Sequence, residues 1–226
     1  FFFIFFFFFL FVCFFFFVFL FFFFFSFFFF FFIFRFVVNM FFLIYNGCKI
    51  TFFLMWLFTM PFILEMEIIM TLWLRNIPPY AMLFTSLAVM NVLVNSVSQP
   101  IATAARAPGK MKNYELTLGL IQFLIFALSW VVLKFGAEAY SIYIVALFVN
   151  ILMLVVRLFL VKNLIDLNIG DFVNKVIYPI IKVVAVSSVL SFTFKTLIPE
   201  GLIFSLFTVM FTIFSICLSV YYLGLD

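Results

Sequence analysis

The 226-residue chain contains no histidine, and only 9% of its residues are charged. Soluble proteins carry charge on about a quarter of their residues, so this composition excludes an ordinary soluble domain. The three cysteines, Cys13, Cys48 and Cys217, are far apart and lie in or beside apolar runs. Their spacing indicates neither a disulfide framework nor a Cys/His metal cluster, and we expect no metal and no cofactor.

Sequence signatures of enzymes and of nucleic-acid-binding proteins are also missing. The chain has no phosphate-cradling glycine loop, no Asp-x-Asp pair and no long hydrophilic stretch. We therefore expect that it is not an enzyme; a membrane glycosyltransferase or polymerase is the weaker alternative. The net charge of +4 does not indicate nucleic-acid binding, because Lys and Arg mark the cytoplasmic loops of membrane proteins.

Apolar sequence is what the chain has in abundance. Hydrophobic residues make up 70% of it, and the mean hydropathy is +1.46. Runs of about 20 apolar residues recur, each long enough to cross a bilayer of about 30 Å as a helix. These runs do not alternate apolar with polar residues, as the strands of a membrane β-barrel do. The sequence therefore predicts an all-α, polytopic transmembrane bundle.

The first 36 residues have a composition of their own. They contain 27 Phe residues, and the exceptions are Ile, Leu, Val, Cys, Ser and one arginine, Arg35. Codons for the first five lie a single nucleotide change from a Phe codon, which favours a translated T-rich repeat over a native membrane anchor. We expect residues 1–36 to be a low-complexity segment that is not native, and 37–226 to be the C-terminal transmembrane bundle of a longer protein.

Six membrane-spanning helices are predicted in the remaining sequence. Pro61 should kink the first, because proline lacks an N–H donor and its ring clashes one turn back. The segment 162–175 is too polar to cross the membrane, and we predict an amphipathic connector at the interface. The six predicted ranges are about 50–74, 79–104, 114–134, 141–161, 176–196 and 201–223.

Positive charge is distributed unequally over the two sides that these six crossings define. The side with more cations is expected to be cytoplasmic, because cytoplasmic loops of membrane proteins carry the excess of Lys and Arg. That side has Lys49, Arg106, Lys110, Lys112, Arg157, Lys162 and Lys175, and the other has Arg75, Lys134 and Lys195.

Much of this charge lies in the stretch ARAPGKMKNYE, residues 105–115, which contains Arg106, Gly109, Lys110 and Lys112. We expect a cytoplasmic loop that fixes the orientation of the helices on either side. It is also open that this loop attracts an anionic headgroup or ligand.

Polar residues within the predicted helices are candidates for a substrate path. Asn91, Asn95, Ser98 and Gln99 follow the spacing i, i+4, i+7 and i+8, which puts them on one face of a helix. This stripe could bind the hydroxyl groups of a sugar, or it could join the helix to a neighbour.

Two cations inside predicted helices are further candidates. Arg157 shares a helix face with Asn150, seven residues earlier. Lys182 lies about six residues into its helix, roughly 9 Å from the end at 1.5 Å per residue. Intramembrane cations usually face a bundle interior or a wet cavity, although a lysine can also extend to the interface.

Glu65 is the candidate for coupling transport to a proton or cation, and the alternative is an ion pair with a Lys or Arg of another helix. Glu67 is about 200° away around the helix, since each residue turns it by about 100°, so the two carboxylates cannot face one cavity. The aromatic residues Trp56, Trp73, Tyr80 and Tyr140 are expected at the membrane interfaces.

The loop ARAPGKMKNYE resembles the A-x-G-K-[IM]-K-x-Y-Q loop of the bacterial polysaccharide-unit flippases, the O-antigen transporters of the MATE-like superfamily. The stretches FLMWLFTMPFILEMEIIMTLWLRNIPPYAMLF, NSVSQPIATAARAPGK and YIVALFVNILMLVVRLFLVKNLI are similar to family segments in the same order. The resemblance covers about residues 50–226. Pro108 and Glu115 depart from the pattern, in which a small or hydroxyl residue and Gln are usual.

The resemblance implies two helical bundles that open alternately to each side of the bacterial inner membrane, of which this chain matches the second. The implied activity is translocation of an undecaprenyl-diphosphate-linked oligosaccharide, an O-antigen or exopolysaccharide repeat unit, to the outer leaflet. The implied partners are membrane lipids, this lipid-linked oligosaccharide and the polysaccharide polymerase machinery. The alternatives are a fragment of a drug or cation antiporter and a non-functional pseudogene or gene-prediction product.

The charge distribution predicts that Lys110 is cytoplasmic and Lys134 external. Cysteine probes placed at these two positions, in a chain whose native cysteines are replaced by serine, should react with membrane-impermeant reagents from opposite sides. Labelling of both probes from the same side would contradict the six-crossing topology.

Overall fold

The computed structural model describes residues 40–74, 77–109, 112–199 and 201–224. The Phe-rich segment 1–36, Arg75 and Lys110 lie outside the described residues. Within these ranges every regular element is helical, and six helices are long and apolar enough to cross a membrane. The predicted all-α transmembrane bundle is therefore confirmed.

The helices follow the predicted order, and their ends differ from the predictions mainly in the first and fifth spans. The elements are α2 (Met40–Leu64), α3 (Met66–Leu74), α4 (Ala81–Arg106), α5 (Lys112–Lys134), α6 (Ser141–Ile165), α7 (Ile169–Phe172), the π-helix η1 (Val173–Ile177), α8 (Tyr178–Leu197), α9 (Leu202–Ser219) and the π-helix η2 (Val220–Gly224).

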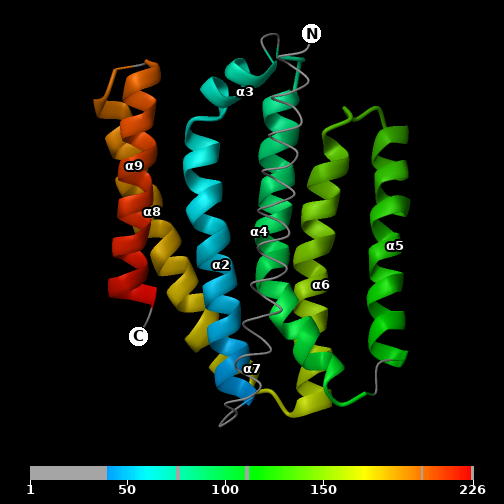
Figure 1. Cartoon of the computed structure of the whole chain (residues 1–226). Helices are drawn as coiled ribbons and strands as arrows, with labels where there is room; N and C mark the ends of the chain where they lie inside the picture. The colour runs from blue at the N-terminus through cyan, green and yellow to red at the C-terminus, as the bar shows by residue number, and fades with distance from the viewer. Residues whose placement is uncertain (1–39, 75–76, 110–111, 200, 225–226) are drawn as a thin grey trace, which may run out of the picture.

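Helix α2 is the centre of the bundle. Figure 1 shows α5, α6, α4 and α2 side by side, with α8 and α9 beyond α2, and the contacts between these helices agree with that order. In an apolar 18-residue stretch of α2, 50% of the residues are buried inside the protein, whereas in the corresponding stretch of α5 only 11% are. The core accordingly gathers around Cys48, Phe52 and Trp56 of α2, whereas α5 presents its apolar side chains outward, as a lipid-facing helix does.

Successive spanning helices run in opposite directions. The first turn of α2, the end of α4 and α7 lie at one end of the bundle, and α3 lies at the other (Figure 1). Arg106 and Lys112 consequently lie at the α7 end, whereas Lys134 ends α5 at the α3 end. Lys49 was predicted to be a loop cation on the cytoplasmic side. This prediction is wrong, because Lys49 lies within α2 and is only 7% exposed.

The first span begins earlier than predicted and ends at a break. It starts at Met40 instead of about residue 50, and Glu65 separates α2 from α3. Pro61 remains inside α2, and the break comes one turn later. The N–H of Glu65 still donates to the carbonyl of Pro61 at 3.1 Å, so the chain bends without losing that bond. Figure 1 shows α3 turned away from the axis of α2.

The predicted connector 162–175 is mostly helical: its charged and amide side chains are exposed, and it is continuous with the spanning helices on either side. Helix α6 continues to Ile165, and α7 runs through η1 directly into α8. The side chains of Leu167, Phe172 and Val176 are at most 1% exposed. These apolar residues bind the segment to the core, and only a short turn of about three residues, 166–168, separates α6 from α7.

Candidate functional site

The polar side chains between α4 and α6 form a buried group, here called the α4–α6 seam, which consists of Asn91, Ser98, Asn150 and Arg157. All four are less than one tenth exposed. Polar groups in a membrane bundle usually find partners on neighbouring helices, because lipid offers none. The seam confirms that Asn150 and Arg157 share a face of α6, since both bond to α4.

The two asparagines bond to each other across the helix pair. The Nδ2 of Asn150 donates to the Oδ1 of Asn91 at 2.9 Å, and the Nδ2 of Asn91 donates to the carbonyl of Tyr143 on α6 at 3.2 Å. Both amide side chains thus have protein partners. We therefore infer that this pair joins α4 to α6. Joining two helices was one of the two roles that the sequence left open for Asn91, and binding of sugar hydroxyl groups was the other.

Arg157 is less completely paired. Its Nη1 donates to the backbone carbonyl of Ser98 at 2.8 Å, but its Nε has no hydrogen-bond partner among the described residues. The hydroxyl groups of Ser98 and Tyr114 are likewise buried and unpaired there. The charge of Glu115 acts on Arg157, but no carboxylate among the described residues lies within ion-pair distance of it. Because a buried charge without a close counter-charge is costly, this end of the seam is a candidate site for an anion or a polar group.

The polar stripe of α4 is only partly buried. Asn91 and Ser98 face α6, Asn95 is half-buried, and Gln99 is exposed. At 100° per residue, Asn95 and Gln99 are turned progressively away from the direction of Asn91. Asn95 and Gln99 therefore stay candidates for a path on the open face of α4, and the structure does not bring them to Arg157.

Lys182 lies apart from the seam. It is exposed on α8, and its Nζ is 4.3 Å from the centre of the Tyr178 ring, a distance typical of a cation–π contact. The expectation that Lys182 faces the bundle interior is not met among the described residues. Its role on a substrate path stays a prediction that concerns the outer surface of α8.

Glu65 is held in a second buried cluster where α2 breaks. Its Oε1 accepts a hydrogen bond from Thr208 of α9 at 2.7 Å and lies 3.6 Å from the Nζ of Lys195 on α8. That Nζ also donates to the carbonyl of Leu64. The structure thus shows the ion pair that the sequence left as an alternative to coupling, and Glu67 is exposed on the other side.

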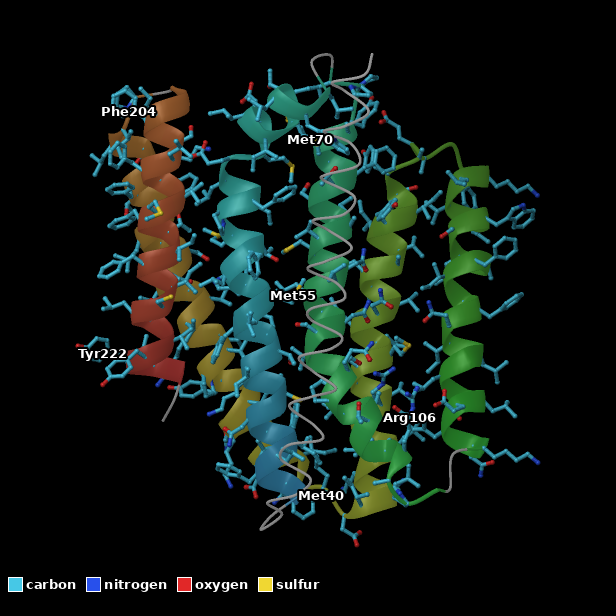
Figure 2. The ribbon with its side chains drawn as sticks, viewed as in Figure 1. Met40, Met55, Met70, Arg106, Phe204 and Tyr222 are labelled. Carbon is cyan, nitrogen blue, oxygen red and sulfur yellow. The ribbon has the colours of Figure 1, made fainter. Side chains whose placement is uncertain are left out.

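A pocket of about 480 Å³ opens where α5 begins. Figure 2 shows Arg106 at the end of α4, near the start of α5, and its Nη2 lies 3.5 Å from the Oε1 of Glu115. Gly109 has a φ of +73°, a conformation that glycine adopts without strain. The pocket is lined by Gly109, Lys112, Asn113, Tyr114, Leu160, Asn163 and Leu164.

The aromatic residues divide between the core and the loops. Trp56 was predicted to lie at a membrane interface, but it belongs to the core: it is 6% exposed, and its Nε1 donates to Ser187 of α8 at 2.9 Å. Tyr80 and Tyr140 lie in loops at the α3 end with their ring centres 5.8 Å apart. A hydrogen bond to Glu138 and the charge of that carboxylate raise the pKa of Tyr80.

A row of buried serine and threonine hydroxyl groups lies between α8 and α9, and the sequence analysis did not predict it. Ser191 and Ser215 are 3.2 Å apart through their Oγ atoms, and both are buried. The signal was present, because buried hydroxyl residues of α9 repeat at alternating intervals of four and three, the spacing of one helix face. These residues are Thr208, Thr212, Ser215 and Ser219.

Comparisons with known proteins identify no relative: no protein family, no curated protein and no solved structure matches the chain.

The bond between Asn91 and Asn150 should appear as a coupling energy. We expect Asn91→Leu and Asn150→Leu to destabilise the bundle by less in combination than the sum of their separate effects, with a coupling of about 1 kcal/mol. Unfolding in mixed detergent micelles measures these free energies. Asn95→Leu is the matched control on the same helix and should be nearly neutral; additive effects of the two seam variants would refute the coupling.

The Glu65–Lys195 pair should respond unequally to loss of either partner. Lys195→Met leaves a buried carboxylate without its cation, whereas Glu65→Gln leaves a lysine side chain that is 41% exposed and can be hydrated. We expect Lys195→Met to cost about 1–2 kcal/mol of unfolding free energy, more than Glu65→Gln, after allowing for that exposure. The double variant should recover part of the loss. An equal cost for the two single variants would show that burial of Glu65 does not control the pair.

Proposed function

We propose that the chain forms one six-helix bundle of a bacterial inner-membrane flippase that translocates a lipid-linked oligosaccharide. The order of the family-like stretches along residues 50–226 supports this proposal, as does the presence of six spanning helices. The observation that carries it is the incompletely paired Arg157 within the α4–α6 seam.

The chemistry of an undecaprenyl-diphosphate-linked sugar matches that position. Such a substrate presents a diphosphate anion and many hydroxyl groups, and both must pass an apolar barrier of about 30 Å. Arg157 is eight residues before the end of α6 at Ile165, which places it about 12 Å along the helix at 1.5 Å per residue. Its guanidinium is therefore a cation within the membrane region, close to the cation-rich end of the bundle.

The magnitude of the interaction is large enough to affect transport. Two unit charges 4 Å apart interact by about 4 kcal/mol at an effective dielectric constant of about 20, before desolvation is counted. A net share of about 1.4 kcal/mol would change a rate tenfold. The drug or cation antiporter has less support, because Glu65, its coupling candidate, is engaged with Lys195 and Thr208.

Arg157→Ala should therefore reduce flipping more than tenfold in a full-length transporter that joins residues 37–226 to the first bundle of a related flippase. Arg157→Lys should retain part of the activity, because the charge remains while the planar geometry is lost. The measurement is the transfer of a fluorescent lipid-linked oligosaccharide across proteoliposomes, with membrane insertion checked for every variant.

Lys134→Ala is the control, since it removes a cation at the opposite end of the bundle, where Lys134 lies over Trp130. Lys182→Ala tests the second candidate, because loss of flipping in this variant would put the exposed surface of α8 on the path. Wild-type flipping by Arg157→Ala would overturn the assignment of Arg157 as a substrate-path residue.

A further inference from the structure

We infer that the pocket at the start of α5 binds the phosphate group of an anionic lipid. Three polar side chains on two helices, Lys112, Asn113 and Asn163, line it. It also lies beside the first turn of a 23-residue helix. Backbone N–H groups at a helix N-terminus are unpaired donors, and the helix dipole favours an anion there.

The balance of charge at the pocket is positive. Glu115 is the carboxylate in the first turn of α5, and it is paired with Arg106 at 3.5 Å. Lys112, in contrast, has no carboxylate partner among the described residues. An exposed ammonium group without a counter-charge is therefore available at the rim of the pocket, where a phosphate oxygen can accept hydrogen bonds from it.

A buried hydroxyl strengthens the case for a ligand. Tyr114 lines the pocket and is 2% exposed, yet its hydroxyl has no hydrogen-bond partner among the described residues. A buried hydroxyl without a partner is costly. Tyr114 also lies close enough to Arg157 to interact with its charge, so the pocket adjoins the end of the α4–α6 seam that is incompletely paired.

The remaining lining residues point to a lipid as the source of the phosphate. Leu160 and Leu164 are partly buried apolar residues of α6 on the wall of the pocket. The pocket lies where α5 begins and α6 approaches its end, so polar and apolar walls meet at the end of two apolar helices, the region of a membrane protein where lipid headgroups lie. Two kinds of lipid carry a phosphate group next to an apolar chain: a bulk anionic phospholipid and a polyprenyl diphosphate carrier. Only binding of the polyprenyl diphosphate carrier rests on the proposed function.

Binding of fluorescent lipids to the purified 226-residue chain in neutral detergent tests the site. The probes are phosphatidylglycerol, a polyprenyl diphosphate, and phosphatidylcholine with matched acyl chains. We expect both anionic lipids to bind more tightly than phosphatidylcholine. Lys112→Gln should weaken this binding about fivefold, since a surface cation contributes about 1 kcal/mol toward anionic lipids. Asn163→Asp should weaken it further, because it places a negative charge in the pocket.

Asn168→Asp is the matched control. It adds the same charge at the same end of the bundle, outside the lining of the pocket, and Asp can keep the cap that Asn168 makes with the N–H of Gly170. Its lipid affinity should equal that of the unmodified chain. Equal losses for Asn163→Asp and Asn168→Asp, or unchanged affinity in both pocket variants, would overturn the site.

The two anionic probes identify the source of the phosphate. Tighter binding of the polyprenyl diphosphate supports a substrate-entry site, and tighter binding of phosphatidylglycerol supports a site for membrane phospholipid; both results support phosphate recognition in the pocket. If lipid binding persists while the full-length transporter does not flip its substrate, the proposed function fails and the lipid site stands. If the transporter flips its substrate but the pocket variants do not change lipid binding, the proposed function stands and the lipid site fails.

Discussion

Every polar group inside a membrane bundle needs a partner within the protein, because the surrounding lipid supplies none. In the described residues many hydroxyl groups donate to carbonyls of their own helix, and several other polar side chains find partners across helix boundaries. Cys48 and Thr51 of α2 donate to carbonyls of α4 at 3.3 and 3.0 Å, the asparagine pair joins α4 to α6, and Trp56 joins α2 to α8. The polar contacts thus follow the same helix order as the apolar packing, and α2 is central to both.

The same constraint accounts for the break between α2 and α3. A carboxylate at position 65 inside a continuous spanning helix would lie in an apolar environment. The bend one turn after Pro61 instead places Glu65 where α8 supplies the ammonium of Lys195 and α9 supplies the hydroxyl of Thr208. These two partners offset the cost of burying the charge. The ion pair joins the α2–α3 break to α8, and the Thr208 hydrogen bond joins it to α9.

Local sequence was sufficient to predict the number of spans, the fold class and the shared face of Asn150 and Arg157, because length, apolarity and helical periodicity are properties of one helix. It was not sufficient for Trp56 or Lys49, whose burial depends on which helices surround α2. Lys195 illustrates the same limit: its position near a helix end suggested a loop charge, while its partner lies far away in the sequence on another helix. The helical continuation through residues 162–175 was not predicted, because half of these 14 residues are polar or charged and only two, Leu167 and Phe172, are buried apolar side chains.

The candidate site contains two cations in different environments. Lys112 is exposed at the end of the bundle, where water and salt screen its charge and where it can attract an anion without a large desolvation cost. Arg157 is buried and acts over a short distance in a medium that screens weakly. Tyr114 lies between these environments, lining the pocket and interacting with the charge of Arg157. The two cations thus differ in what an anion would encounter: at Lys112 a hydrated, screened charge, and at Arg157 a buried charge that Glu115 partly compensates.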